Sequence, residues 1–200
     1  KIQVASFVSP KAVPTMADAA ELFATIKKKP GVTYTPLYLN AKGFERARQV
    51  SEVDMEGRIH FYTTDQFALQ NNNRPAAQVR DDQIAMIDLC VEHGVPLEGA
   101  YIMTAFGCNL TGEVPLSAIT DLALWTAEQC RVRQMPLPTI VLADTVGWAS
   151  PDDVKRRVNA VREVLPAARI GLHLHDTRGL GIANVYAALE EGVDFFEGSV

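Results

Sequence analysis

Two histidines, His173 and His175, are the residues of this sequence best suited to chemistry by their type and spacing. They end an apolar segment, residues 169–175, whose composition predicts a β-strand. Side chains alternate between the two faces of a strand, so both imidazoles would point one way and Leu174 the other. Two imidazoles on one face can share a divalent cation, although such a pair also occurs as two ordinary polar side chains at a strand end. The pair is therefore a candidate metal site.

Two other polar side chains lie near the ends of predicted strands. Asp144 directly follows the apolar segment 139–143, and Ser6 lies near the end of the segment 1–7. The carboxyl ends of parallel strands meet at one edge of a sheet or one mouth of a barrel, which is where α/β proteins bind their ligands. An Asp before a turn can also simply cap that turn. We predict that Asp144 and Ser6 join the histidines in one site, with Asp144 reaching into it.

Segments with strand character alternate with helical segments along the chain. Strands are expected at 1–7, 33–39, 57–63, 99–106, 139–143, 169–175 and 193–200, helices at 15–26, 44–50, 75–91, 115–130, 150–165 and 182–189, and a polar loop at 65–74. The strands are mostly apolar and no hairpin signal joins them. This pattern predicts an α/β fold with a parallel sheet.

A TIM (β/α)₈ barrel fits this alternation best. Because such barrels need eight strands and about 250 residues, we expect residues 1–200 to be a single (β/α)₈-type catalytic domain, truncated at both ends and holding strands two to eight. A doubly wound open sheet is the alternative. It would place a glycine-rich phosphate turn after an early strand, whereas Gly179 and Gly181 follow the histidines late in the chain.

The composition is typical of a globular protein that acts on small molecules. Hydrophobic residues make up 48% of the chain, and the net charge is -5. Basic residues form no cluster beyond Lys27–Lys29, so nucleic-acid binding is not indicated, and no apolar run approaches the length of a membrane span. The three cysteines lack the number and spacing of a disulfide framework, which indicates a reducing compartment. We therefore expect a cytoplasmic protein, with a true N-terminus before the strand that opens this chain.

Several short motifs, taken together, resemble the 3-hydroxy-3-methylglutaryl-CoA (HMG-CoA) lyases, within the metal-dependent lyases and Claisen-type synthases built on a TIM barrel. The resemblance covers nearly the whole chain and rests on residues 6–11, Val13, Pro14, Met16, residues 42–45, Asn71, Asn73, residues 106–108, Gly112, residues 144–147, residues 173–179, Ala183 and Asn184. Synthases for isopropylmalate, homocitrate and citramalate typically have Asn-Asp after the second histidine, where this chain has Asp176 and Thr177. The motifs therefore favour the lyase branch.

The resemblance implies a retro-Claisen cleavage of an HMG-CoA-like acyl-CoA to acetyl-CoA and acetoacetate. It implies that His173 and His175 bind a divalent ion, Mg²⁺ or Mn²⁺, while imidazole ligands alone would suit Zn²⁺ equally well. Asp144 is then the candidate base, or the group that orients the base. The remaining metal ligands and a catalytic cysteine would lie outside this chain. A homodimer is expected.

Ser6, Asn71 and Asn73 are the expected contacts to the acyl-CoA substrate, although asparagines in such a segment often only form turns. Three sites depart from the lyase pattern: Gln3 stands where lyases usually carry Glu, Asn109 follows Gly107 and Cys108 where they carry Pro, and Met103 stands where they carry Ser. A neutral amide cannot act as a base, so the substrate could differ from that of the parent lyases. Two alternatives remain open: a condensing synthase of the isopropylmalate or citramalate type, and a non-catalytic barrel with a vestigial metal site.

Overall fold

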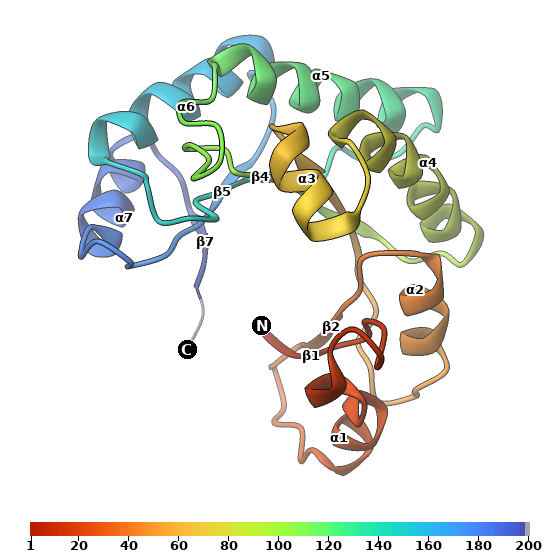
Figure 1. Ribbon diagram of the computed structural model, residues 1–200. Coiled ribbons are helices and arrows are strands. Elements are labelled where there is room, and N and C mark those ends of the chain that lie inside the picture. The colour runs from red at the N-terminus through yellow and green to blue at the C-terminus, as the bar shows by residue number, and fades with distance from the viewer. Residues whose placement is uncertain (199–200) are drawn as a thin grey trace. The chain divides into compact units, whose positions relative to one another are not determined.

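The structure, a computed structural model, describes residues 1–198 and contains the predicted alternation of strands and helices (Figure 1). The chain forms two compact units. The first holds residues 1–59 and 82–97, and the second holds residues 60–81 and the chain from residue 98 onward. The chain passes from one unit to the other within β3 (Gly57–Tyr62), α4 (Ala76–Glu92) and β4 (Leu97–Met103). We describe each unit by itself.

A parallel pair of strands, β1 and β2, forms the centre of the first unit. In chain order its elements are β1 (Ile2–Ser6), a 3₁₀ turn (Pro14–Met16), α1 (Ala19–Thr25), β2 (Tyr34–Leu37) and α2 (Ala41–Arg48). Phe7 packs against Phe23 of α1, with ring centroids 5.8 Å apart. Gly43 of α2 approaches the same region so closely that an added Cβ would lie 2.6 Å from the carbonyl oxygen of Phe7. The helix that the sequence predicted to begin at residue 15 begins at Ala19 instead, after the 3₁₀ turn.

A five-stranded sheet with the strand order β3-β4-β5-β6-β7 forms the centre of the second unit. The elements from residue 57 onward are β3 (Gly57–Tyr62), α3 (Asp65–Asn72), α4 (Ala76–Glu92), β4 (Leu97–Met103), α5 (Leu116–Val132), β5 (Thr139–Ala143), α6 (Pro151–Val164), β6 (Ile170–His173), α7 (Gly181–Glu190) and β7 (Phe195–Glu197), of which β3, α4 and β4 are divided between the two units. Strands β4 to β7 pair in parallel. The sequential order lacks the reversal of a doubly wound sheet and is the pattern of a barrel wall.

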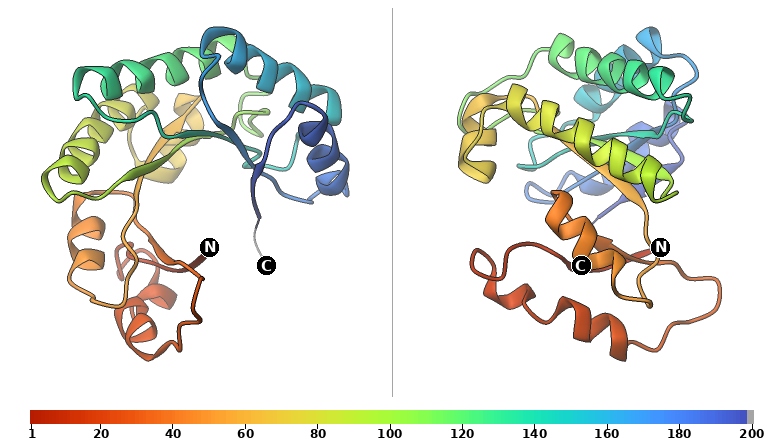
Figure 2. Two further views of the ribbon diagram at one scale, coloured as in Figure 1. Left: turned by 180° about the vertical axis from the view of Figure 1, so that it is seen from behind. Right: turned by 90° about the vertical axis from the view of Figure 1, so that its right-hand side faces the viewer.

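Strand β5 of the second unit is buried on both faces. Ile140, Val141, Leu142 and Ala143 of β5 are all buried. Helices α5, α6 and α7 lie side by side along one side of the sheet, as Figures 1 and 2 show. Ser150 accepts a hydrogen bond from the backbone N–H of Asp153 and so caps α6 as expected from the sequence. These helices hold the strands whose carboxyl ends carry the candidate residues.

The segment 65–74, predicted to be a polar loop, is largely helical, and that prediction was wrong. α3 is retained because Ala68 packs in an apolar cluster with Tyr62 and Val79. The burial of one small apolar face stabilises α3, although the other residues of the helix are mostly polar. The helix ends at Asn73, which takes a left-handed conformation with φ of 54° and donates its N–H to the carbonyl oxygen of Leu69. Asparagine is one of the few residues that adopts this conformation readily.

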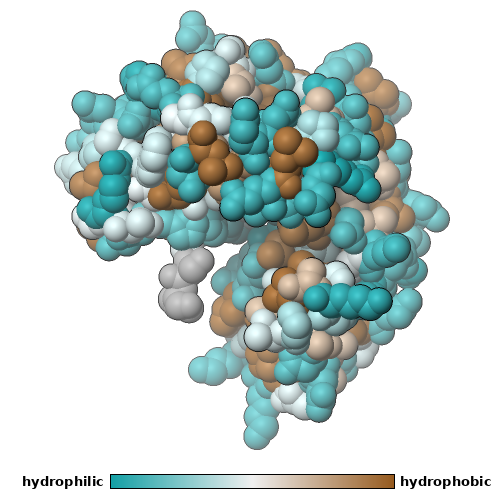
Figure 3. Space-filling model, in the orientation of Figure 1, coloured by the Kyte–Doolittle hydropathy of each residue, from teal (hydrophilic) through white to brown (hydrophobic). Residues whose placement is uncertain are grey.

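The surface shown in Figure 3 is mostly polar, with apolar side chains scattered among the polar ones. Such scattered apolar side chains are normal for a protein surface in water. None of the helices within residues 1–198 combines the length and the apolar composition needed to cross a membrane.

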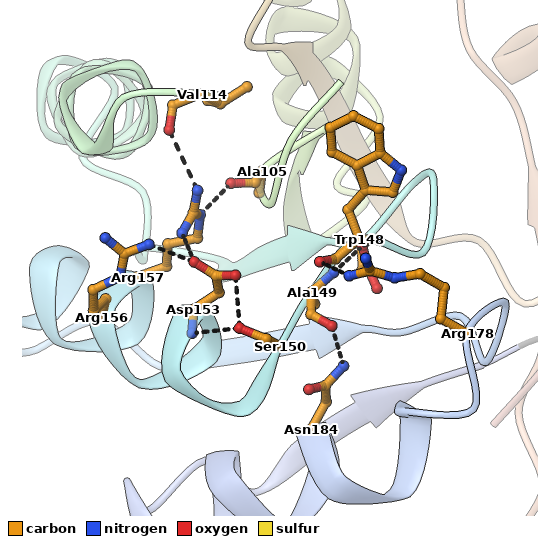
Figure 4. Close-up of polar contacts among 11 residues, drawn as sticks. Ala105, Val114, Trp148, Ala149, Ser150, Asp153, Arg156, Arg157, Arg178 and Asn184 are labelled. Atoms are coloured by element: carbon orange, nitrogen blue, oxygen red, sulfur yellow. Dashed lines mark hydrogen bonds and ion pairs between the residues drawn. The ribbon is translucent and has the colours of Figure 1, made fainter. Parts of the chain in front are cut away.

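Arg157 of α6 is a buried cation that holds the loop after β4 in place (Figure 4). Its guanidinium donates to the carbonyl oxygens of Ala105 at 2.6 Å and Val114 at 3.3 Å, and to Asp153 Oδ1 at 2.9 Å. The neighbouring Arg156 also pairs with Asp153, but its side chain is 63% exposed against 6% for Arg157. Arg157 is thus the residue that satisfies the buried carbonyl groups.

We expect Arg157→Met to lower the free energy of unfolding of the full-length protein by about 3 kcal/mol, because two buried carbonyl oxygens lose their donor. Urea unfolding measures the change. Arg156→Met is the matched control and should change stability by less than about 1 kcal/mol, since it removes one exposed ion pair. Equal losses in the two variants would contradict a special role for the buried arginine.

Candidate functional site

The two histidines lie together at the carboxyl end of β6. His173 is the last residue of the strand and is the register partner of Ala143 on β5. Strand-like bonding continues for one more residue, because the N–H of Leu174 donates to the carbonyl oxygen of Glu197 at 3.1 Å. The ring centroids of His173 and His175 are 5.0 Å apart, with an interplanar angle of 70°. The spacing in the sequence thus brings two imidazoles side by side.

Each imidazole has its Nδ1 atom next to an oxygen. His175 Nδ1 lies 2.8 Å from the backbone carbonyl oxygen of Asp144. A carbonyl oxygen can only accept, so Nδ1 of His175 is the donor in this hydrogen bond. His173 Nδ1 lies 3.5 Å from Glu197 Oε2. A histidine ligand in a metal site usually donates one ring nitrogen to the protein and binds the metal through the other, and the hydrogen bond of His175 fits that pattern.

The donor set of the two histidines therefore fits a divalent ion, but it is only part of a complete site. Within residues 1–198 no group of three or more His, Cys, Asp and Glu side chains is arranged to hold a metal. Two imidazole nitrogens leave further coordination positions for other oxygen ligands or substrate. Metal binding by His173 and His175 therefore stays a prediction.

Asp144 follows β5, and its side chain holds the turn that comes next. Its backbone N–H donates to the carbonyl oxygen of His173 at 2.8 Å. Its Oδ1 accepts hydrogen bonds from the N–H groups of Trp148 at 2.7 Å and Ala149 at 3.1 Å. Its Oδ2 is buried without a hydrogen-bond partner among the described residues. Burial raises the pKa of Asp144, and the two backbone N–H groups partly offset that rise.

The turn after Asp144 is locked to the turn after the histidines. Arg178 Nε donates to the carbonyl oxygen of Gly147 at 3.1 Å and its guanidinium also bonds the carbonyl oxygen of Trp148 (Figure 4). Asn184 of α7 donates to the carbonyl oxygen of Ala149 at 3.1 Å. Each of the two Asp-Thr-x-Gly motifs follows a strand, and these bonds hold the two turns together.

Gly147 is required at the contact between these turns. Its φ of +70° lies in the left-handed region, and an added Cβ would lie 2.4 Å from Thr177 Oγ1. Gly179 has almost the same φ, +71°, but an added Cβ would meet nothing within 4 Å. Comparing alanine substitutions at Gly147 and Gly179 therefore separates the cost of backbone strain, which both share, from the cost of a steric clash, which only Gly147 has.

We expect Gly147→Ala to destabilise the full-length protein by about 3 kcal/mol, and Gly179→Ala by about 1 kcal/mol. Both variants strain the backbone, but only the first forces Thr177 to move. Thermal and urea unfolding of the two variants measure the difference. Losses of equal size would show that the turns separate easily and that the close contact is not required.

The three other predicted site residues lie on β1 and α3 and at the end of α3. Ser6 is the last residue of β1 in the first unit, where it is the register partner of Leu37. Asn71 lies in α3, and Asn73 ends that helix in the second unit. Both asparagines are exposed. The left-handed conformation of Asn73 accounts for that residue structurally, and the contacts of all three residues to substrate remain predictions.

Two residues near the histidines were missed by the sequence analysis. Glu197 is the register partner of His173, and Tyr101 of β4 donates its hydroxyl to Glu197 Oε1 at 2.8 Å. An acid inside the apolar segment 193–200 was the available signal for Glu197. Nothing in the sequence around Tyr101 indicates its partner, which lies 96 residues away.

A comparison with protein-family models relates this geometry to known proteins. The model of the HMGL-like family matches residues 3–200. The chain belongs to the HMGL-like family. The resemblance to HMG-CoA lyases, based on motifs that include the histidine pair, is thereby confirmed.

Individual relatives of this HMGL-like chain are similar over its whole length. A curated relative from Pseudomonas aeruginosa, named 3-hydroxy-3-isohexenylglutaryl-CoA/hydroxy-methylglutaryl-CoA lyase, is 36% identical over 100% of the chain and 63% of its own length. The crystal structure of hydroxymethylglutaryl-CoA lyase from Pseudomonas aeruginosa is 35% identical with a TM-score of 0.85, covering 100% of this chain and 63% of that one. An HMG-CoA lyase from Acinetobacter baumannii, in complex with coenzyme A and 3-methylmalate, is 31% identical with a TM-score of 0.83, covering 99% and 61%.

These similarities confirm the predicted fold class, an α/β TIM barrel that is incomplete in this chain. The sequential parallel strand order and the structural similarity agree, and the doubly wound alternative is wrong. The HMGL-like chain spans about three fifths of the length of its curated relatives, 58% to 64% for five hydroxymethylglutaryl-CoA lyases.

Proposed function

We propose that this chain is part of a metal-dependent lyase that cleaves an HMG-CoA-like acyl-CoA into acetyl-CoA and acetoacetate by a retro-Claisen reaction. The observation that carries the proposal is the pair of imidazoles, whose ring centroids are 5.0 Å apart and whose Nδ1 atoms each lie beside an oxygen, in a chain of the HMGL-like family. The chain covers about three fifths of its relatives, so the activity is proposed for the whole protein and not for residues 1–200 alone.

His173 and His175 would bind a divalent ion through their Nε2 atoms. Such an ion, when bound, supplies Lewis-acid chemistry that stabilises negative charge on the hydroxyl oxygen of the substrate. We propose Mg²⁺ or Mn²⁺ from the family resemblance, with Zn²⁺ as a further candidate because imidazole suits it. The role of the histidines is to fix the position of that charge at the carboxyl ends of β5 and β6.

Asp144 is the proposed base, or the group that orients the base. One of its carboxylate oxygens is occupied by two backbone N–H groups, which fixes the orientation of the side chain. The other oxygen, Oδ2, has no hydrogen-bond partner among the described residues. A carboxylate oxygen held in this way can accept a proton from a substrate hydroxyl that comes within hydrogen-bond distance. The backbone of Asp144 also supports His175, so the residue links proton transfer to the histidine pair.

The proposed substrate is an acyl-CoA with a hydroxyl and a branch at its third carbon. Support comes from the relatives: one carries two glutaryl-CoA derivatives in its name, and another was crystallised with coenzyme A. Ser6, Asn71 and Asn73 are proposed contacts to this substrate. Met103 ends β4 and is half-buried, so the change from the usual Ser makes this position more apolar.

The remaining proposals concern the whole protein. Residues 1–200 are proposed to belong to a single catalytic barrel domain, with a homodimer as its assembly. Cys90, Cys108 and Cys130 are free and buried, which supports a reducing compartment, and we propose the cytoplasm.

A product assay on the full-length protein tests the proposed reaction. We expect release of acetoacetate from HMG-CoA only when a divalent ion is present. A condensing synthase of the isopropylmalate or citramalate type would instead release free thiol from acetyl-CoA when a 2-oxo acid is added. Absence of both reactions, together with absence of metal binding, would support a non-catalytic barrel with a vestigial site.

A further inference from the structure

Glu197 lies beside His173 in a position that is set by the sheet. The two residues are register partners on the parallel strands β6 and β7, so their side chains emerge on the same face. Glu197 Oε2 is 3.5 Å from His173 Nδ1, and the side chains are 19% and 25% exposed. A partly buried carboxylate this close to an imidazole favours the tautomer whose proton faces the carboxylate.

Tyr101 fixes the orientation of Glu197. The tyrosine lies on β4, with β5 and β6 between it and β7, and its hydroxyl donates to Glu197 Oε1 at 2.8 Å. The ring of His60 stacks on the ring of Tyr101, with centroids 5.2 Å apart and an interplanar angle of 22°. Tyr101 itself is 6% exposed. One oxygen of Glu197 is thus bound to Tyr101, while the other faces His173.

The two histidines are supported in different ways. His175 Nδ1 bonds the backbone carbonyl oxygen of Asp144, which no side-chain substitution removes. His173 Nδ1 faces the side chain of Glu197, which a substitution can remove. A change at Glu197 should therefore affect one imidazole and leave the other as an internal reference.

We propose that Glu197 and Tyr101 are positioning residues that hold His173 in the tautomer with the proton on Nδ1, so that Nε2 is free to bind the divalent ion. This inference rests on the metal site of the proposed function. Without Glu197, the ring of His173 could rotate or change tautomer, and the proton would occupy Nε2 in part of the molecules. Partners of this kind typically change metal affinity by about 10-fold to 100-fold when they are removed.

The test uses the full-length protein, with histidines labelled by ¹⁵N, without metal and then with Mn²⁺. Long-range ¹H–¹⁵N spectra report which ring nitrogen carries the proton, and His173→Gln identifies the signals of His173. In the wild type we expect the proton of both histidines on Nδ1. In Glu197→Ala we expect His173 to shift toward the Nε2-protonated tautomer while the signals of His175 stay unchanged.

Titration with Mn²⁺ gives the second measurement. We expect about a 10-fold to 100-fold loss of affinity in Glu197→Ala, and a smaller loss in Glu197→Gln, whose amide oxygen can still accept from Nδ1. Tyr101→Phe keeps the stack with His60 and should cost only a few-fold. Asp194→Ala is the matched control, because it removes a carboxylate near β7 that pairs with Arg169 at 3.0 Å. It should leave affinity and tautomer unchanged.

Wild-type tautomer and Mn²⁺ affinity within two-fold in Glu197→Ala would overturn the inference, as would equal losses in Asp194→Ala. If Glu197→Ala fails to fold, Glu197→Gln and Tyr101→Phe carry the same test. Failure of the wild type to bind Mn²⁺ would contradict the metal site of the proposed function. The tautomer of His173 in the metal-free protein still decides the role of Glu197 in that case.

Discussion

Replacing Asp144 by Asn in the full-length protein should lower the turnover of HMG-CoA by about 10²-fold to 10⁴-fold, the range expected when a general base is removed. The amide has the shape of the carboxylate, and its oxygen can still accept from the N–H groups of Trp148 and Ala149. The turn and the carbonyl support of His175 should therefore be retained. What is lost is the basic Oδ2, which has no hydrogen-bond partner among the described residues.

Three readouts separate loss of the base from loss of structure. The melting temperature and the Mn²⁺ affinity of Asp144→Asn should stay close to those of the wild type while turnover falls. Asp54→Asn is the matched control, because Asp54 also accepts a backbone N–H, from Tyr34 at 2.7 Å, but belongs to the first unit. Turnover of Asp144→Asn within a few-fold of the wild type would mean that Asp144 only caps its turn.

The elements that the sequence predicted well are those with local signals. Four apolar residues followed by Asp144 marked the end of β5 correctly, since the strand ends at Ala143. Ser150 and Pro151 marked the start of α6 because capping depends only on neighbouring residues. The spacing of the histidines predicted that both would lie on one side, and their rings are adjacent. The alternation of side chains along strands and the capping residues of helices were sufficient to predict these parts of the fold.

The errors arose where the signal came from distant contacts. α3 was missed because its composition is polar and only Ala68 is buried within it, in a cluster completed by Tyr62 and Val79. Tyr101 and Glu197 were missed because their contact depends on the register of strands far apart in the chain. The sequence left two roles open for Asp144. The structure shows the turn-holding role and leaves Oδ2 for the proposed role in proton transfer.

The histidine pair itself gives the second large expected effect. We expect His173→Ala or His175→Ala in the full-length protein to lower the affinity for Mn²⁺ by more than about 100-fold, because loss of a direct ligand should exceed the loss of a supporting residue. Each variant removes one of two nitrogen donors from a site for which the described residues provide no third His, Cys, Asp or Glu. Calorimetric titration measures the affinity.

His93→Gln is the matched control for this experiment. His93 stacks on Phe44 at 5.8 Å and lies 3.3 Å from Glu45 in the first unit, so it is a half-buried histidine beside a carboxylate but outside the pair. Its replacement should leave Mn²⁺ affinity within two-fold of the wild type.

A double variant tests whether the two histidines share one ion. Their rings are held independently, His175 by a backbone carbonyl and His173 by Glu197. If the imidazoles bind one ion together, the double variant should bind Mn²⁺ no better than the weaker of the two single variants. If the losses were small in each single variant and summed in the double one, the two rings would be binding separate ions, and the shared site would be wrong.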